Sequence, residues 1–188
     1  MRSHIVLGAI GLVSLFPVTV ASAQNIALGT SVSLAAGSAT GADLSTLTDG
    51  IFRPRGTLWT DGTIYWSGLD TALEVDLGGT FLITGAAVQV DDNDAYTLLY
   101  RDLTTGNWLT MWDVPNYDAF GSGMQTRPNP DNDSEVFIFS SSVTTDRVRL
   151  LAASGDNSYS ASELVLIPAP GVASVIVAGL FGVTRRKR

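Results

Sequence analysis

The sequence contains no cysteine, one histidine and one lysine among its 188 residues. The histidine and the lysine are His4 and Lys187, so residues 24–184 have neither of these residue types. These absences exclude a thiol or lysine nucleophile, a Ser-His-Asp triad and a histidine-rich zinc site from that region. Paired carboxylates could still act as in a glycosidase, but 18 acidic residues make some pair expected by chance. We therefore predict that the protein is not an enzyme.

Basic residues are also scarce in the middle of the chain. All 18 acidic residues lie between Asp43 and Glu163, whereas five of the 11 basic residues lie at the two ends. The middle therefore has a formal charge of −12, against −7 for the whole chain. This balance argues against binding to nucleic acid phosphates and favours solubility and attraction of cations. An apolar fraction of 45% is too high for a disordered chain.

Residues 1–23 have the three parts of a signal peptide. Arg2 provides the positive start, residues 5–20 are mostly apolar, and the Ala-Ser-Ala sequence at 21–23 suits signal peptidase. We expect cleavage before Gln24 and export through the inner membrane. The alternative is a retained membrane anchor, for which the apolar stretch is short.

Residues 168–188 form a second three-part segment. A Pro-Ala-Pro motif precedes an apolar run at residues 171–183, and a basic end follows, made of Arg185, Arg186, Lys187 and Arg188. As a helix the run would be about 20 Å long, whereas a bilayer core is about 30 Å thick. The basic end would stay in the cytoplasm. A short anchor behind two prolines is typical of a sorting tail, and an ordinary uncut anchor is the alternative.

This tail resembles the PEP-CTERM sorting signal of Gram-negative and related bacteria. Pro168 and Pro170 match its Pro-Glu-Pro-like motif, with Ala169 in place of the central glutamate. The resemblance implies recognition by an exosortase, which would cut near this motif, and only transient contact with the membrane. It places the mature protein in the cell envelope, at the cell surface or in the extracellular matrix.

The region between the two signals alternates apolar and polar residues with a period of two, which is typical of β-strands. We expect strands at residues 71–77, 86–90, 96–102, 108–114, 135–139, 147–152 and 163–167. Turn residues separate them, with Gly78-Gly79 after the first and a hairpin loop at 104–107 in which Gly106 has a positive φ. Many short strands predict a single all-β domain, residues 24–167, folded as an antiparallel β-sandwich or jelly roll.

Several short motifs resemble, in their order, those of coagulation-factor type C (discoidin) domains, which have a galactose-binding-like jelly-roll fold. They are Asn25-Ile-Ala-Leu-Gly29, Thr48-Asp-Gly50, Trp66-Ser67, Leu73-Glu-Val-Asp-Leu-Gly78 and Tyr159-Ser-Ala-Ser-Glu-Leu-Val165. The family's "S-x-D-G-x-x-W" element is altered here to Asp102-Leu-Thr-Thr-Gly-Asn-Trp108. The resemblance implies a non-catalytic binding domain of this fold.

The same resemblance implies one structural Ca²⁺ ion, which prefers hard oxygen ligands. Asp49 and Glu163 match the family's carboxylate ligands, and the loop that ends at Thr57 would complete the site. Arg53 and Arg55 lie within this loop. A side chain of either arginine turned inward could instead pair with Asp49 and replace the metal.

Trp59 and Tyr65 are candidate sugar contacts, because they flank a turn-rich segment and sugar sites combine a flat aromatic face with a few polar groups. Trp66, Trp108 and Trp112 are interpreted as core residues.

Further candidates are Asp92 and Asn93, in the acidic run 91–94 after a strand, and Arg127, which could bind a carboxylate or a sugar hydroxyl. The alternatives are a solvated turn for this run and for residues 131–135, and a structural ion pair for Arg127. Neither run fits an EF-hand.

The expected function is therefore that of an exported, non-catalytic module that binds carbohydrate or another surface polymer. The alternative is a structural surface or matrix protein that contacts proteins and has no sugar site. Such a protein is expected to show an exposed apolar patch or a free sheet edge instead of an aromatic cleft.

Overall fold

The computed structural model describes residues 24–117 and 121–170, so the expected signal peptide and the tail beyond Pro170 lie outside the described residues. The described chain forms a 3₁₀ helix, η1 (Leu44–Thr48), and strands β1 (Ser31–Ala36), β2 (Thr40–Gly41), β3 (Ile64–Ser67), β4 (Ala72–Asp91), β5 (Ala95–Arg101), β6 (Trp108–Val114), β7 (Met124–Arg127), β8 (Phe137–Ser154) and β9 (Ser158–Pro168). Within these residues, no helix is both apolar enough and long enough to cross a membrane.

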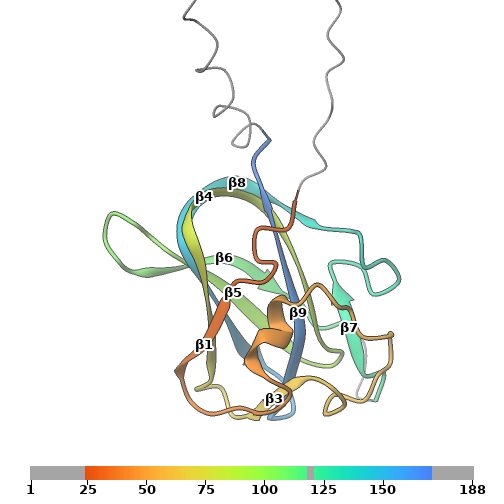
Figure 1. Ribbon diagram of the computed structural model, residues 1–188. Coiled ribbons are helices and arrows are strands. Elements are labelled where there is room, and N and C mark those ends of the chain that lie inside the picture. Colours follow the sequence, from red (N-terminus) through yellow and green to blue (C-terminus); the bar gives the residue numbers. More distant parts are fainter. Residues whose placement is uncertain (1–23, 118–120, 171–188) are drawn as a thin grey trace, which may run out of the picture.

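The strands pair antiparallel in the order β2-β3-β9-β4-β8-β5-β6, and β1 and β7 both pair with β4. β4 and β8 are long and curved, and they turn over together at the end of the molecule where β9 finishes (Figure 1). The first part of β4 pairs with β1 and β8, and its last part pairs with β9 and β7. Two layers of one antiparallel sheet therefore face each other, and the all-β prediction is confirmed.

The expected turn at Gly78-Gly79 is wrong, because β4 continues through it. Pairing with β8 is interrupted between Asp76 and Phe81, where Gly78 has φ +68° and donates its N–H to Asp76 Oδ1 at 3.0 Å. A bulge of this kind bends a strand without ending it. β8 likewise joins two expected strands, at 135–139 and 147–152, into one.

The expected hairpin between β5 and β6 is confirmed. The Asp102 N–H donates to the Asn107 carbonyl at 2.8 Å, and the Gly106 N–H donates to the Asp102 carbonyl at 2.7 Å. Gly106 has φ +75°, a conformation that glycine adopts without the steric penalty of a Cβ atom.

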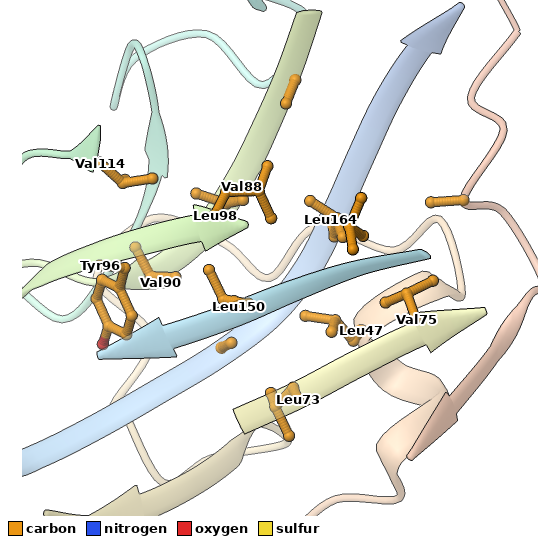
Figure 2. Packing of buried hydrophobic residues seen from close by; sticks show 14 of the residues in the cluster. Leu47, Leu73, Val75, Val88, Val90, Tyr96, Leu98, Val114, Leu150 and Leu164 are labelled. Carbon is orange, nitrogen blue, oxygen red and sulfur yellow. The ribbon is translucent and has the colours of Figure 1, made fainter. Parts of the chain in front are cut away.

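Apolar side chains from both layers meet in one core (Figure 2), which includes Leu73, Val88, Leu98, Leu150 and Leu164. Burying a side chain of this size stabilises the fold by about 1.5–3 kcal/mol. Trp66 and Trp112 are 3% and 5% exposed, which confirms both as core residues. Trp108 is not in this core; it is half-buried, and the Arg149 guanidinium lies 3.9 Å from its ring centre.

Candidate functional site

Two buried polar side chains hold the loop that contains Asp49 and Thr57. Glu163 on β9 and Gln89 on β4 are paired across the ladder. The Gly50 N–H donates to Glu163 Oε2 at 2.9 Å. The Gln89 amide accepts the Arg53 N–H at 2.6 Å and donates to the Arg53 carbonyl at 2.9 Å. The sequence argument missed Gln89, and the available signal was a polar residue in a run of small and branched apolar residues.

The Glu163 carboxylate has one oxygen atom that is open to a hard cation. Its Oε1 is buried without a partner among the described residues. Burial, and then the neighbouring charge of Asp49, raises the pKa of Glu163 to about 8. Within the described chain, no three acidic, histidine or cysteine side chains are grouped as metal ligands. Backbone oxygens would therefore supply most of the coordination, as Ca²⁺ accepts.

The loop residues Thr57, Arg53 and Arg55 make their contacts away from Glu163. The Thr57 hydroxyl donates to the Pro54 carbonyl at 2.6 Å, and the Thr57 carbonyl accepts the Met124 N–H at 2.9 Å. Arg55 pairs with Asp131. The Arg53 guanidinium packs beside Gly62, and its Nε has no partner among the described residues. These contacts of the two arginines do not involve Asp49.

The turn at residues 91–94 meets the turn at residues 155–157, and together they are called the acidic end. Asp91, Asp92 and Asp94 are 4%, 1% and 0% exposed, so the alternative of a solvated turn is wrong for residues 91–94. The Ser122 N–H donates to Asp92 Oδ2 at 2.7 Å, and the Asp156 N–H donates to Asp94 Oδ1 at 3.2 Å. Asn93 Oδ1 and Asp94 Oδ2 are buried without partners among the described residues.

Burial also raises the pKa of two aspartates in this turn. Desolvation raises the pKa of Asp91 to about 7 and that of Asp94 to about 6, because a buried carboxylate loses the water that stabilises its charge.

Arg127 lies beside the acidic end and is 0% exposed. Its guanidinium donates to the carbonyls of Pro115 at 2.9 Å, Asp91 at 3.3 Å and Asp92 at 2.9 Å. It also lies 4.7 Å from the centre of the Tyr117 ring. These contacts join three backbone segments, so the placement of Arg127 favours a structural role over ligand binding.

Trp59 and Tyr65 come together as the sequence suggests. Their ring centres are 5.3 Å apart and their planes are at 84°, so the edge of one ring meets the face of the other. The Thr63 hydroxyl donates to the Trp59 carbonyl, and Gly41 lies close to the Tyr65 ring. Both aromatic side chains are half-buried, so part of each surface is already covered by the protein.

An open groove with a volume of about 580 Å³ lies between β6 and the beginning of β8, and it is called the side groove. The Trp112 and Phe137 rings stack with centres 4.9 Å apart and planes at 6°, and Phe139 follows at 6.0 Å from Phe137. The sequence argument missed this site, and the signal was the Phe-Ile-Phe run at 137–139. The lining residues are Tyr100, Thr110, Met111, Trp112, Asp113, Phe137, Ile138, Phe139, Ser140, Ser141 and Val143.

Comparison with known proteins defines the class of fold. No family model and no curated protein matches the sequence, but solved structures of carbohydrate-binding modules match the described sandwich. At identities below 20% this likeness is one of fold, and it confirms the galactose-binding-like architecture.

Three of these structures are particularly informative. The family 32 module of Streptococcus pneumoniae EndoD has 13% identity and a TM-score of 0.54, and the match covers 78% of this chain and 100% of that one. Chitosan-binding module 2 of a Paenibacillus sp. IK-5 chitosanase/glucanase, in complex with chitotriose, has 17% identity, a TM-score of 0.52 and coverages of 76% and 99%. A fucose-binding module from Streptococcus pneumoniae has 13% identity and a TM-score of 0.52, and the match covers 78% of this chain and 96% of that one.

Proposed function

We propose that the protein is a non-catalytic carbohydrate-binding module that is exported to the cell envelope or the extracellular matrix. The observation that carries this proposal is the shared sandwich, which spans 76–78% of this chain and nearly the full length of the three modules. The absence of cysteine, histidine and lysine from residues 24–184 also supports a binding role over catalysis.

A saccharide array screened with the full-length chain in the presence of Ca²⁺ tests the proposal. We expect binding to at least one neutral or amino saccharide, and calorimetry then measures its dissociation constant. A flat response across envelope and matrix polysaccharides contradicts the proposal.

A structural role through protein contacts is the second candidate. β6 is the last strand in the order of the sheet, and Leu109 on this strand is 42% exposed. Ile138, which lines the side groove, is 62% exposed. Exposed apolar residues beside a free edge favour association between chains. Sedimentation velocity of the wild type and of Ile138→Ser tests this: concentration-dependent association that the substitution removes would support the structural role.

We further propose one structural Ca²⁺ ion at Asp49 and Glu163, supported by the buried, unpartnered Glu163 Oε1. When bound, the ion would stabilise the loop by neutralising both carboxylates. A ligand that binds only the folded state raises the melting temperature. We expect a chelator to lower it for the wild type and not for Glu163→Gln, and no shift in the wild type contradicts the site.

For export, we propose that signal peptidase and an exosortase process the two ends of the chain. β9 ends at Pro168, and the Ala169 N–H donates to the Leu82 carbonyl at 2.8 Å, so the Pro-Ala-Pro motif begins where the sheet ends. A cut near this motif would leave the strands intact. Mass spectrometry of the native protein is expected to find Gln24 first and a C-terminus near Pro170. A chain that starts at Met1 and ends at Arg188 contradicts the proposal.

A further inference from the structure

The side groove presents one aromatic ring as a supported platform. Trp112 is 5% exposed and belongs to the core, whereas Phe137, stacked parallel to it, is 38% exposed and lines the groove. A ring held from behind by a buried indole loses little conformational freedom when a ligand packs on it. Phe137 can therefore bind a flat, weakly polar surface such as the C–H face of a sugar ring.

Hydroxyl groups also line this groove. Tyr100, Thr110, Ser140 and Ser141 line the groove, and their hydroxyls form no hydrogen bonds within the described part of the chain. A hydroxyl group can both donate and accept a hydrogen bond, which matches the hydroxyl groups of a saccharide. An aromatic face with a few polar groups around it is the general form of a small-ligand site.

The charge of the groove restricts the saccharide. Asp113 is exposed and is the one charged residue among the described groove residues. Two arginines of the adjoining strands are already engaged, since Arg101 pairs with Asp146 and Arg149 pairs with Glu74 at 2.8 Å. An acidic saccharide would meet a carboxylate and no cation in the groove, so like-charge repulsion weakens its binding.

We propose that the side groove binds a saccharide without acidic groups, with one sugar ring on Phe137 and Asp113 accepting a hydrogen bond from a hydroxyl or ammonium group. This inference rests on the proposed function and deepens it, because it assigns the site and the class of ligand. It also separates the ligand site from the pair Trp59 and Tyr65.

Calorimetry on the full-length chain tests this inference with four trisaccharides, built from glucosamine, N-acetylglucosamine, glucose or galacturonic acid. We expect at least one of the first three to bind about two- to fivefold more tightly than the galacturonic acid form, because repulsion by an exposed carboxylate such as Asp113 is worth less than about 1 kcal/mol.

Variants of the platform residue locate the site. Loss of the stacking contact in Phe137→Ala is expected to weaken binding about tenfold. Phe137→Leu keeps an apolar side chain without a flat ring and is expected to weaken binding similarly. Phe137→Tyr keeps the flat ring and is expected to keep the affinity of the wild type. Leu103→Ala, at an exposed apolar residue outside the groove, is the control and is expected to bind like the wild type. Trp59→Ala tests the alternative aromatic pair. Melting curves verify that each variant is folded.

The outcomes separate this inference from the proposed function. If Trp59→Ala loses binding and the Phe137 variants keep it, the groove assignment is overturned and the proposed function stands. If the galacturonic acid trisaccharide binds most tightly, the ligand class is overturned. If the wild type binds no saccharide in the four-member set or on the array, the proposed function and this inference fail together.

Discussion

At the acidic end, three aspartates and Arg127 are buried, and many of their hydrogen bonds connect to backbone groups of the protein. In the side groove, the exposed Phe137 ring stacks on the indole of Trp112, and four hydroxyl groups have no partner among the described residues. In the acidic end, the hydrogen bonds of Asp92, Asp94 and Arg127 hold backbone segments together. The side groove leaves an aromatic ring and several hydroxyl groups available to another molecule.

Arg127→Ala should have the largest effect on this comparison. The substitution leaves the carbonyls of Pro115, Asp91 and Asp92 without their donor, and we expect it to lower the free energy of unfolding by about 3–5 kcal/mol. Urea unfolding measures the change. Arg55→Ala is the control, because its ion pair with Asp131 is exposed, and we expect a loss of less than about 1 kcal/mol. A stable Arg127→Ala protein that loses saccharide affinity would reverse the roles of the two regions.

Trp112→Ala tests whether the core supports the binding surface of the groove. Removing this buried side chain should lower the free energy of unfolding by about 3 kcal/mol. It should also weaken saccharide binding, because Phe137 loses the ring on which it stacks. Trp108→Ala is the control on the same strand, since Trp108 is outside the groove. Unchanged affinity in a folded Trp112→Ala protein would show that the support is not needed.

The buried carboxylates predict a pH dependence of stability. Desolvation raises the pKa of Asp91 to about 7 and of Asp94 to about 6, so the folded protein holds protons that the unfolded chain has lost between pH 5 and 8. The free energy of unfolding, measured in the presence of a chelator, should therefore fall by about 4 kcal/mol as the pH rises from 5 to 8, and the raised pKa of Glu163 acts in the same direction. Urea titrations at a series of pH values measure the slope.

Asp94→Asn keeps the shape of the side chain and removes its titration. We expect a shallower slope between pH 5 and 7 for this variant than for the wild type. Equal slopes would mean that Asp94 does not contribute to the pH dependence.

Asp113→Asn should have the smallest effect. The carboxylate is exposed, so its loss should weaken binding of a glucosamine trisaccharide by only about two- to fivefold, through a contact worth less than about 1 kcal/mol. Binding of a neutral trisaccharide should not change, and neither should the melting temperature. Asp70→Asn, in an exposed turn, is the control. Equal losses in the two variants would point to the overall charge of the domain instead of the groove.

Much of the fold could be predicted because it depends on local patterns. The hairpin at residues 102–107 needs only a short loop with Gly106 between two alternating segments. The same kind of reasoning failed at Gly78, because whether glycine ends a strand or bends it depends on β8 continuing alongside. The two motifs that contain Asp49 and Glu163 were found by resemblance, whereas Gln89 lies in no such motif and its role depends on the loop that packs against it.

The sequence by itself determined the all-β class, through period-two alternation, and the lack of cysteine, histidine and lysine in residues 24–184. Only the tertiary structure decided which polar and aromatic residues are buried and which are exposed. Asp92 meets Ser122 and Trp112 meets Phe137, although the two residues of each pair lie far apart in the sequence, and no local pattern predicts such contacts. The physical reason is that burial is a property of the packed chain, whereas alternation is a property of each strand.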